Sequence, residues 1–335
     1  MPGKYMPKNS RDCPEALTHR LRGGSSGLHQ IAQESIFLNV AKQWFVLKQA
    51  SVSAKHAEDI CRSLEKDILP STENVPVQDI KARLLIQVLE PTKARGALET
   101  VRRLVQRINE IMIYAVNTGL IEANPASGIG NAFERPKKQH MPTIRPEELP
   151  KLMRTISMSN LSIPTRCLLE RQLLTLIRPA EASATAWAEI DIEKREWCIP
   201  AEWMKAKRDH IVPLSDQALE ILEIMRPISG RREHVFPSRN DPRKPMNSQT
   251  ANAALKRIGY GDKLVAHGLR SIASTAMNEA EFNADVIEAA LAHCDKNEVR
   301  RAYNRSTYLE QRQELMEWWG NEVYSKNSIC WLYLL

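Results

Sequence analysis

The amino-terminal third of the chain alternates apolar and polar positions with the period of an α-helix. Apolar residues recur every three or four positions in four successive runs, which predicts four helices. The runs cover residues 31–47, 57–68, about 78–89 and about 96–118. Pro70 and Pro91 are expected to stop the second and third helices, and Gly119 the fourth. The pattern indicates a compact helical bundle.

A segment with little periodicity separates this bundle from the rest of the chain. Residues 124–146 contain four prolines, which predicts an interdomain linker. The next residues, PEELPKLM, open a helix with acidic side chains in its first turn. The predicted layout lists a flexible or truncated segment 1–30, a helical domain 31–123, the linker 124–146, a second domain 147–324 and an atypical apolar tail 325–335.

The second domain changes its pattern in the middle. Residues 186–215, AWAEIDIEKREWCIPAEWMKAKRDHIVPLS, alternate apolar and polar positions between turn residues, which predicts an antiparallel sheet of about three short strands. Helical patterns return after Asn247. The predicted fold is mainly α: a helical bundle followed by a mixed α/β domain that is mostly helical. The chain has no GxGxxG or Walker loop and no solenoid-length repeat, which argues against nucleotide-binding and repeat architectures.

Composition narrows the class of partner. The 335 residues carry a formal net charge of +7, which favours a polyanion. No apolar run approaches the roughly 20 residues that span a bilayer, and the amino terminus lacks the apolar core of a signal peptide, so we expect a cytoplasmic protein without membrane contact. The six cysteines form no CxxC pair, which argues against a zinc ribbon or a disulfide scaffold. We expect no metal and no other cofactor.

Basic residues gather around the third and fourth predicted helices. They are Lys93, Arg95, Arg102, Arg103 and Arg107. Such a group suits contact with a phosphate backbone, but a solvated helix face explains it equally well at this point.

Six polar residues in the carboxy-terminal half suggest a specific chemistry. They are Arg178, Lys205, His267, Arg270, His293 and Tyr303, in the settings LLTLIRPAE, WMKAKRDHIVPLS, HGLRSIAST, LAHCDKNEV and RRAYNRSTY. Cleaving a phosphodiester without a metal requires other groups to neutralise the charge that builds on phosphoryl oxygens. Two guanidinium groups are suited to this because they stay protonated and offer paired donors. A phenol surrounded by cations is activated towards its phenolate and serves as the nucleophile.

Local spacing supports this interpretation. His267 and Arg270 stand three residues apart, as do Arg178 and Glu181, so each pair shares a side if the turn is helical. Glu181 is then expected to support the site rather than react. Two tyrosines compete for the nucleophile, Tyr303 and Tyr308.

Together these segments resemble the tyrosine recombinases, and most closely the integrases of P4-like phages and genomic islands. The resemblance covers about residues 31–324 and is strongest in the second domain. It implies a core-DNA-binding bundle and a catalytic domain. It implies Tyr303 as the nucleophile that forms a 3′-phosphotyrosine bond, Lys205 rather than Lys207 or Arg208 as the proton donor to the leaving 5′ oxygen, and His293 as the second histidine of the family. The reaction then needs neither ATP nor metal.

The resemblance also implies partners. These are double-stranded DNA attachment sites, three further copies in a tetramer on DNA, a host DNA-bending protein and an excisionase, and they place the protein at the nucleoid. The carboxy-terminal helix carries Trp318 and Trp319, and in the family such a helix packs onto a neighbouring protomer. We expect these two tryptophans, with Trp187, Trp197 and Trp203, to be packing residues rather than base-stacking ones.

The chain departs from the family pattern at several points. Relatives usually carry a further arm-binding domain, which residues 1–30 are too short to replace, and Leu269 and Glu281 stand where an aromatic residue and a glycine are common. Two alternatives therefore stay open. One is a truncated integrase remnant that binds DNA without cutting it, and the other is a metal-dependent nuclease, for which the carboxylates show no paired-ligand pattern.

Overall fold

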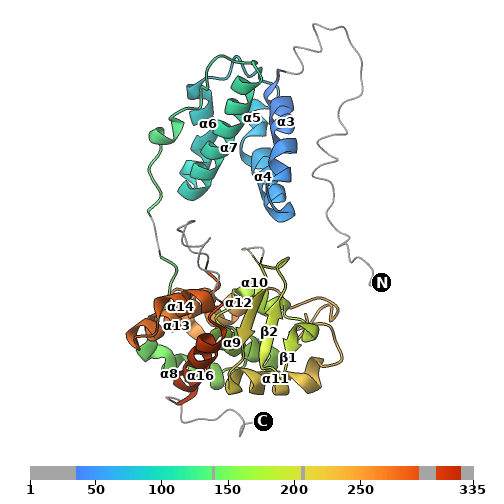
Figure 1. The fold of residues 1–335 in the computed structure, drawn as a ribbon. Coiled ribbons are helices and arrows are strands. Elements are labelled where there is room, and N and C mark those ends of the chain that lie inside the picture. The colour runs from blue at the N-terminus through green and yellow to red at the C-terminus, as the bar shows by residue number, and fades with distance from the viewer. Residues whose placement is uncertain (1–34, 138–139, 205–207, 294–306, 326–335) are drawn as a thin grey trace, which may run out of the picture. The chain divides into compact units, whose positions relative to one another are not determined.

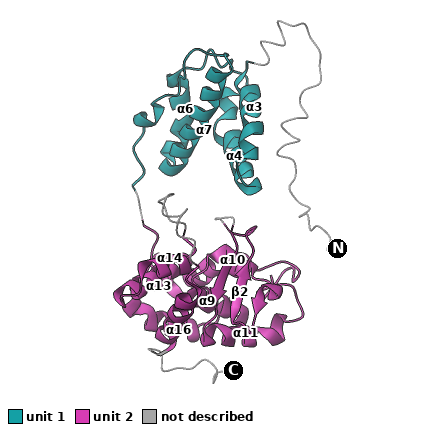
Figure 2. Ribbon diagram, in the orientation of Figure 1, with its two compact units in different colours: residues 1–138 teal, residues 139–335 magenta. Residues whose placement is uncertain are grey.

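The computed structural model describes residues 35–137, 140–204, 208–293 and 307–325 (Figure 1). The chain divides into two compact units, residues 1–138 and 139–335 (Figure 2). Within the described ranges, no helix is both long enough and apolar enough to cross a membrane. The predicted segment 1–30 and nearly all of the predicted tail lie outside the described residues.

The first unit is the predicted helical bundle. Its elements are α3 (Phe37–Ala50), α4 (Ala54–Asp67), α5 (Leu69–Thr72), α6 (Ala82–Ala94), α7 (Leu98–Asn117) and the 3₁₀ turn η1 (Ile129–Ala132). The longest helix, α7, buries one stripe of apolar side chains at three- and four-residue spacing. Leu104, Ile108 and Ile111 of this stripe are fully buried against α3 and α6.

Two prolines were expected to end helices, and this prediction is correct for Pro70 and wrong for Pro91. Pro70 lies in the first turn of α5, so it ends the preceding helix and begins the next, as its missing N–H permits. Pro91 was expected to end a helix, but it lies inside α6, which continues to Ala94. The proline costs only one hydrogen bond near the carboxy-terminal end. Burial of Val88, Leu89 and Thr92 holds the turn in place.

The proline-rich segment 124–146 is not uniformly extended. Its Ala126, Ile129 and Phe133 side chains are buried in the hydrophobic core of the first unit. The segment therefore contributes to packing before the chain leaves this unit. The exact domain boundaries stay a prediction.

The second unit is mostly helical with one small sheet, and the predicted fold class is confirmed. Its elements are η2 (Pro146–Glu148), α8 (Leu149–Ser157), α9 (Ile163–Thr175), α10 (Pro179–Ala184), η3 (Trp187–Glu189), β1 (Ile190–Asp191), β2 (Glu196–Ile199), β3 (His210–Pro213), α11 (Asp216–Ser229), α12 (Thr250–Leu255), the π-helical turn η4 (Lys256–Tyr260), α13 (Gly268–Glu279), α14 (Ala284–Ala290) and α16 (Leu309–Ser325). The sheet is antiparallel in the order β1-β2-β3, with Trp197 opposite Val212 and Ile199 opposite His210.

Helix α9 lies at the centre of this unit. It contacts α10, α11, α12, α13 and α16, and all nine residues from Cys167 to Thr175 are buried. Two of its buried polar side chains have defined neighbours: the Gln172 amide donates to the Ala266 carbonyl at 2.7 Å, and the Arg171 guanidinium lies 4.5 Å from the centre of the Trp197 ring. The Arg171 guanidinium has no hydrogen-bond partner among the described residues, so the aromatic ring is its main polar contact. Because α9 is held on every side, the turn that follows it has a fixed position.

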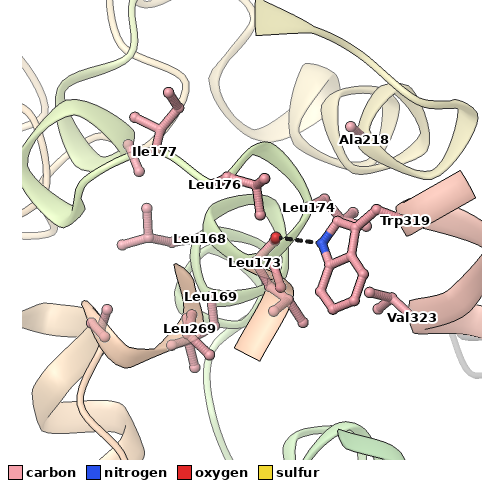
Figure 3. Packing of buried hydrophobic residues seen from close by; sticks show 14 of the residues in the cluster. Leu168, Leu169, Leu173, Leu174, Leu176, Ile177, Ala218, Leu269, Trp319 and Val323 are labelled. Carbon is pink, nitrogen blue, oxygen red and sulfur yellow. Dashed lines mark hydrogen bonds between the residues drawn. The ribbon is translucent and has the colours of Figure 1, made fainter. Parts of the chain in front are cut away.

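The last described helix, α16, packs on its own unit. Figure 3 shows the Trp319 indole against α9, where its N–H donates to the Leu173 carbonyl at 2.9 Å. Trp319 is 1 % exposed, so this part of the helix belongs to the unit's own core. Packing of the helix onto a neighbouring protomer stays a prediction. One tryptophan contradicts the packing prediction: Trp203 is 64 % exposed, because it stands in a turn beyond the end of β2.

Candidate active site

Arg178 stands at the junction between α9 and α10. The chain leaves α9 through Leu176, which adopts a left-handed conformation at φ 56°. Arg178 then occupies the N-cap position of α10 with Pro179 in the first turn. Its backbone N–H donates to one oxygen of Glu181 at 3.1 Å, and its guanidinium donates to the other at 3.0 Å. Glu181 therefore orients Arg178 through two contacts, in the place where a supporting residue was predicted.

Arg270 lies on the first turn of α13 and is 3 % exposed. The first residue of this helix, Gly268, lies close to the backbone at Pro142. A Cβ on Gly268 would lie 2.5 Å from the Pro142 carbonyl oxygen, so the absence of a side chain permits this approach. The Arg270 guanidinium donates to the carbonyls of Leu176 and Leu291. Burial, with the nearby charge of Arg178, lowers the pKa of Arg270 to about 10, so the group stays cationic at neutral pH.

The two arginines are held side by side by consecutive peptide groups. The Arg270 guanidinium bonds the carbonyl of Leu291, and the Arg178 guanidinium bonds the carbonyl of Ala292 at 3.3 Å. Both carbonyls follow the last turn of α14. Two like charges are thus kept close together in a partly desolvated place, an arrangement that favours an anion between or above them.

His293 completes this turn with a defined tautomer. Its Nε2 lies 3.2 Å from the Arg270 guanidinium, and its Nδ1 lies 2.9 Å from a carboxylate oxygen of Glu288. A guanidinium only donates, so Nε2 accepts and the ring proton is on Nδ1, where it donates to Glu288. Glu288 was not among the residues expected at the site. Its position five residues before His293 carries no periodic signal that would have identified it.

His267 occupies the N-cap position of α13, at the surface of the unit. Desolvation by its neighbours lowers the pKa of the imidazole, and the charges of Arg270 and Arg178 lower it further. The imidazole is therefore neutral near pH 7 and lies within the electrostatic influence of both arginines. The predicted pairing of His267 with Arg270 on one side of a helical turn fits this arrangement.

The structure adds His210, which lies in the segment WMKAKRDHIVPLS but was not among the expected site residues. It begins β3 and faces the helical side of the sheet, because it shares a face with the buried Val212. Burial lowers the pKa of His210 to about 4, and the charges of Arg312, Arg178 and Arg270 contribute to the shift. Its Nε2 atom is buried without a hydrogen-bond partner among the described residues. A neutral imidazole therefore borders the arginine pair from the sheet side.

Two of the predicted catalytic residues, Lys205 and Tyr303, lie outside the described residues. The elements on either side of them are described. β2 and β3 flank the segment with Lys205, while His293 and α16 flank the segment with Tyr303. The competing Tyr308 is half-buried and packs against the hydrophobic core of the second unit. That packing gives it a structural place and weakens its claim to be the nucleophile.

The predicted DNA-binding residues of the first unit differ in how they are engaged. Arg102 and Arg103 are the most exposed, at 63 % and 61 % of the side chain, and both donate to Glu99. These contacts hold the pKa of Glu99 at about 2. Arg95 is paired with Asp67 on α4 at 2.7 Å, Lys93 lies 3.2 Å from Glu90, and Arg107 is half-buried and donates to Ser63. The exposed pair on α7 is the better placed for a phosphate backbone.

Within the described ranges, no three His, Cys, Asp or Glu side chains gather in a way that would hold a metal ion.

Comparisons with known proteins find a separate family match in each of the two units. The sequence matches the phage integrase family over residues 142–310 and the phage integrase central domain over residues 37–132. The prophage integrase IntA of Escherichia coli (strain K12) is 60 % identical over 299 residues, which are 89 % of this chain and 72 % of that protein. The integrase of enterobacteria phage P4 is 32 % identical over 324 residues, covering 92 % of this chain and 72 % of that protein.

Solved structures share the fold at low sequence identity. A lambda integrase dimer bound to a COC′ core site matches with a TM-score of 0.61 and 17 % identity, over 79 % of this chain and 93 % of that chain. A lambda integrase tetramer bound to a Holliday junction matches with a TM-score of 0.64 and 16 % identity, over 84 % and 85 %. Since the family match covers both units and a relative is 60 % identical over most of the chain, the chain belongs to the phage integrase family and is a site-specific DNA recombinase of the tyrosine type.

Proposed function

We propose that the protein integrates and excises a prophage or genomic island, using Tyr303 to cut DNA and form a 3′-phosphotyrosine bond. The observation that carries the proposal is the pair of guanidinium groups, Arg178 and Arg270, held on the successive carbonyls of Leu291 and Ala292. Keeping two cations together costs free energy unless an anion offsets their repulsion. A scissile phosphate of DNA is an anion of the right charge and geometry for two planar donors.

Each side chain has a role in this reaction. The Tyr303 phenol loses its proton to solvent as its oxygen attacks phosphorus, the bond from phosphorus to the 5′ oxygen breaks, and Lys205 gives that oxygen a proton. Arg178 and Arg270 neutralise the charge that develops on the two non-bridging oxygens. His267, which is neutral and has an exposed ring, donates a hydrogen bond to the phosphate. His293 orients Arg270 and Glu181 orients Arg178.

The covalent phosphotyrosine bond conserves the free energy of the broken phosphodiester bond. The free 5′ hydroxyl of a second strand can attack the phosphotyrosine, which restores the phosphodiester and releases Tyr303. Cleavage and rejoining therefore need no ATP, and charge neutralisation by arginine takes the place that a metal ion has in other phosphoryl-transfer sites.

We extend the proposal to partners through the relatives. Lambda integrase, which shares the fold, has been captured as a dimer on core-site DNA and as a tetramer on a Holliday junction. We propose that this chain binds double-stranded attachment sites at the nucleoid and recombines them as a tetramer, with Lys93, Arg95, Arg102, Arg103 and Arg107 contributing to DNA contact. A host DNA-bending protein and an excisionase complete the proposed set of partners.

The test is the capture of the covalent intermediate. A duplex that carries the attachment sequence and a nick beside the scissile phosphate loses a short fragment on cleavage, so the adduct cannot be rejoined. With chelator present, a denaturing gel should show an adduct with the wild-type chain and with Tyr308→Phe, and none with Tyr303→Phe. An adduct that survives in Tyr303→Phe would reject the assigned nucleophile. DNA binding without any wild-type adduct would reject strand transfer and favour a remnant that only binds, and cleavage that stops with chelator would favour a metal-dependent nuclease.

A further inference from the structure

Arg312 makes an unusual pair of contacts in the first turns of α16. The residue is 3 % exposed. Its Nε donates to the Thr307 carbonyl at 2.8 Å, and one terminal nitrogen donates to the Ile211 carbonyl at 2.7 Å. These acceptors are main-chain atoms, so the guanidinium recognises the path of the backbone rather than the identity of a side chain.

The two carbonyls belong to segments that lead to the proposed catalytic residues. Ile211 is the second residue of β3, which follows the segment that contains Lys205. Thr307 is the first described residue after the segment that contains Tyr303, and it lies four positions beyond that tyrosine. Arg312 therefore joins, at one point, the strand after the proposed proton donor and the stretch after the proposed nucleophile, although Arg312 and Ile211 are 101 residues apart in the sequence.

An arginine is costly at this place, and α16 has further anchors that do not involve it. Burial lowers the pKa of the Arg312 guanidinium, although the charge of Glu196 opposes this shift. Later turns of α16 carry their own anchors. Trp319 bonds the Leu173 carbonyl at 2.9 Å, and the Tyr324 hydroxyl donates to Glu170 at 2.7 Å. The buried charge thus lies in the first turns of α16, the end of the helix that follows the Tyr303 segment in the sequence.

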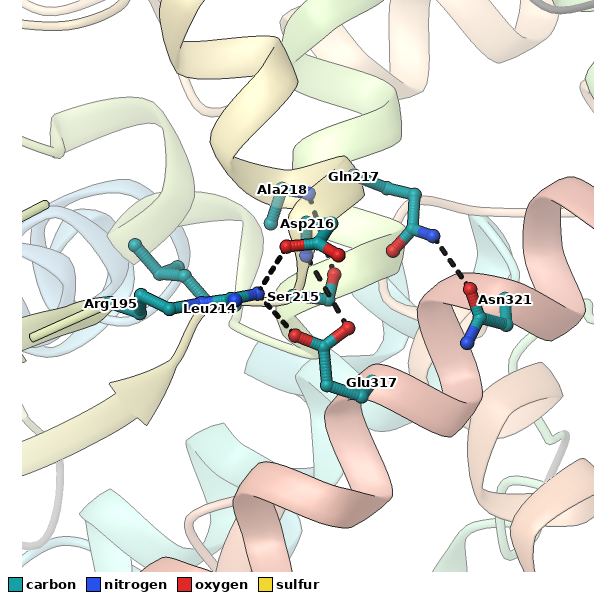
Figure 4. Close-up of polar contacts among 8 residues, drawn as sticks. All are labelled: Arg195, Leu214, Ser215, Asp216, Gln217, Ala218, Glu317 and Asn321. Carbon is teal, nitrogen blue, oxygen red and sulfur yellow. Dashed lines mark hydrogen bonds and ion pairs between the residues drawn. The ribbon is translucent and has the colours of Figure 1, made fainter.

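A second set of anchors offers a matched control. Figure 4 shows the Arg195 guanidinium between the carboxylates of Asp216 and Glu317, with Asn321 accepting from Gln217 at 2.9 Å. Arg195 also joins α16 to the sheet region, but it holds α16 to the start of α11 and contacts neither Thr307 nor Ile211. Loss of Arg195 should therefore loosen α16 without releasing the two catalytic segments.

We propose that Arg312 is a positioning residue for strand cleavage, which sets the relative placement of the Lys205 segment and the Tyr303 segment through its bonds to Ile211 and Thr307. The inference rests on the proposed roles of those two residues. It predicts that removing the guanidinium slows the chemical step while DNA binding is retained, because the arginine pair that meets the phosphate is held by other contacts.

The experiment compares Arg312→Gln with Arg195→Gln on the nicked duplex. Three quantities are measured for each variant: the melting temperature, the Kd for DNA, and the single-turnover rate of adduct formation at saturating protein. We expect the adduct rate of Arg312→Gln to fall by about 10- to 100-fold, the range expected for misplaced reacting groups, with Kd within about twofold of wild type. Arg195→Gln should lose similar thermal stability and keep a rate within about threefold of wild type.

A modified substrate distinguishes misplacement of the proton donor from misplacement of the nucleophile. If sulfur replaces the bridging 5′ oxygen, the leaving thiolate needs no proton, so a variant that lacks only the proton donor regains its rate. Lys205→Ala should be restored on this substrate, while Arg312→Gln should be restored only in part because the nucleophile is still misplaced. Arg312→Lys, which keeps the charge and reaches one carbonyl, should be intermediate in rate, and it carries the same comparison if Arg312→Gln does not fold.

The outcomes are distinct. An unchanged rate in Arg312→Gln, or an equal loss in Arg195→Gln, would overturn the proposal and leave Arg312 as a contributor to folding alone. Full restoration of Arg312→Gln by the sulfur substrate would also overturn it, since only the Lys205 side would then be positioned. The wild-type and Tyr303→Phe lanes identify failure of the proposed function itself: no wild-type adduct, or an adduct in Tyr303→Phe, rejects that function and this inference with it.

Discussion

The guanidinium of Arg270 lies 3.2 Å from Nε2 of His293. The contact makes the imidazole an acceptor on the side of the arginine pair and a donor on the side of Glu288, so a carboxylate at the surface determines the tautomer of a ring at the site. Arg270, His293 and Glu288 therefore form one chain of contacts, and Glu288 acts on Arg270 through the ring between them.

This relationship predicts the effect of removing Glu288. In Glu288→Ala the imidazole can adopt either tautomer, and the form with a proton on Nε2 repels the Arg270 guanidinium instead of accepting from it. We expect the rate of adduct formation to fall by about tenfold, as for loss of other residues that orient a functional group, with little change in DNA binding. Glu279→Ala, which removes an exposed glutamate of α13, is the control and should leave the rate unchanged. Equal rates for the two variants would contradict the orienting role.

Glu281 stands in a left-handed conformation, at φ 61°. Glycine adopts this conformation without the steric cost that a Cβ brings. We predict that Glu281→Gly stabilises the protein by about 0.5–1 kcal/mol, the strain relief less the extra entropy of the unfolded chain. Urea denaturation measures the difference. Glu279→Gly, within α13, is expected to destabilise by about 1 kcal/mol, so a uniform response of both sites would contradict the conformational cause.

The buried carboxyl of Glu170 leads us to predict that the stability of the protein depends on pH. Burial raises the pKa of its carboxyl from the ordinary value of 4.5 to about 7, while the hydrogen bond from Tyr324 opposes the rise. The folded state therefore holds a proton that the unfolded state has released, and the contribution of Glu170 to stability is present below pH 4.5 and is lost as the pH rises to about 7.

The variant Glu170→Gln removes this titration. Relative to wild type, it should gain stability progressively as the pH increases from 4.5 to 7, measured by urea denaturation at a series of pH values. Glu314→Gln, which changes an exposed glutamate of α16, should follow the wild-type curve. If the difference in unfolding free energy between wild type and Glu170→Gln stays constant over this range, the carboxyl does not titrate as proposed.

The exposed arginines of α7 predict a change in the salt dependence of DNA binding. If Arg102 and Arg103 each contact a phosphate, the double variant Arg102→Gln/Arg103→Gln should reduce the slope of log K against log salt concentration by about two. Arg83→Gln, at the opposite end of α6 from Lys93, is the control and should keep the wild-type slope. Fluorescence anisotropy over a salt series measures both. Parallel slopes for all three proteins would place the DNA contact elsewhere.

Local patterns were sufficient for most of the architecture. Helical spacing identified the helices of the bundle, because an amphipathic helix must bury one stripe whatever its neighbours are. Alternation identified the sheet for the same reason. The error at Pro91 shows where this reasoning ends: the sequence records the lost hydrogen bond, but only the packing of Val88, Leu89 and Thr92 shows that the helix tolerates it.

Part of the chemistry of the site could also be predicted from the sequence. Arg178, Glu181, His267, Arg270 and His293 stand within short motifs, and the spacing of each pair follows from the helical turn that contains it. Residue type and spacing are properties of the chain, so they indicate an anion site and the family without knowledge of the fold. The family match then confirmed the class of protein.

What the linear order leaves open is which distant groups meet. Arg312 and Ile211, Arg270 and Leu176, and His210 and the arginine pair are far apart in the sequence and carry no shared period. Their proximity arises because α9 is buried on all sides and the sheet, α13 and α16 pack around it. The chain alone therefore indicates most of the elements, the residue types of the proposed site and the family. Tertiary packing determines the partners of each charge and hence their pKa values, because burial and Coulomb interactions depend on distance in space and not on position along the chain.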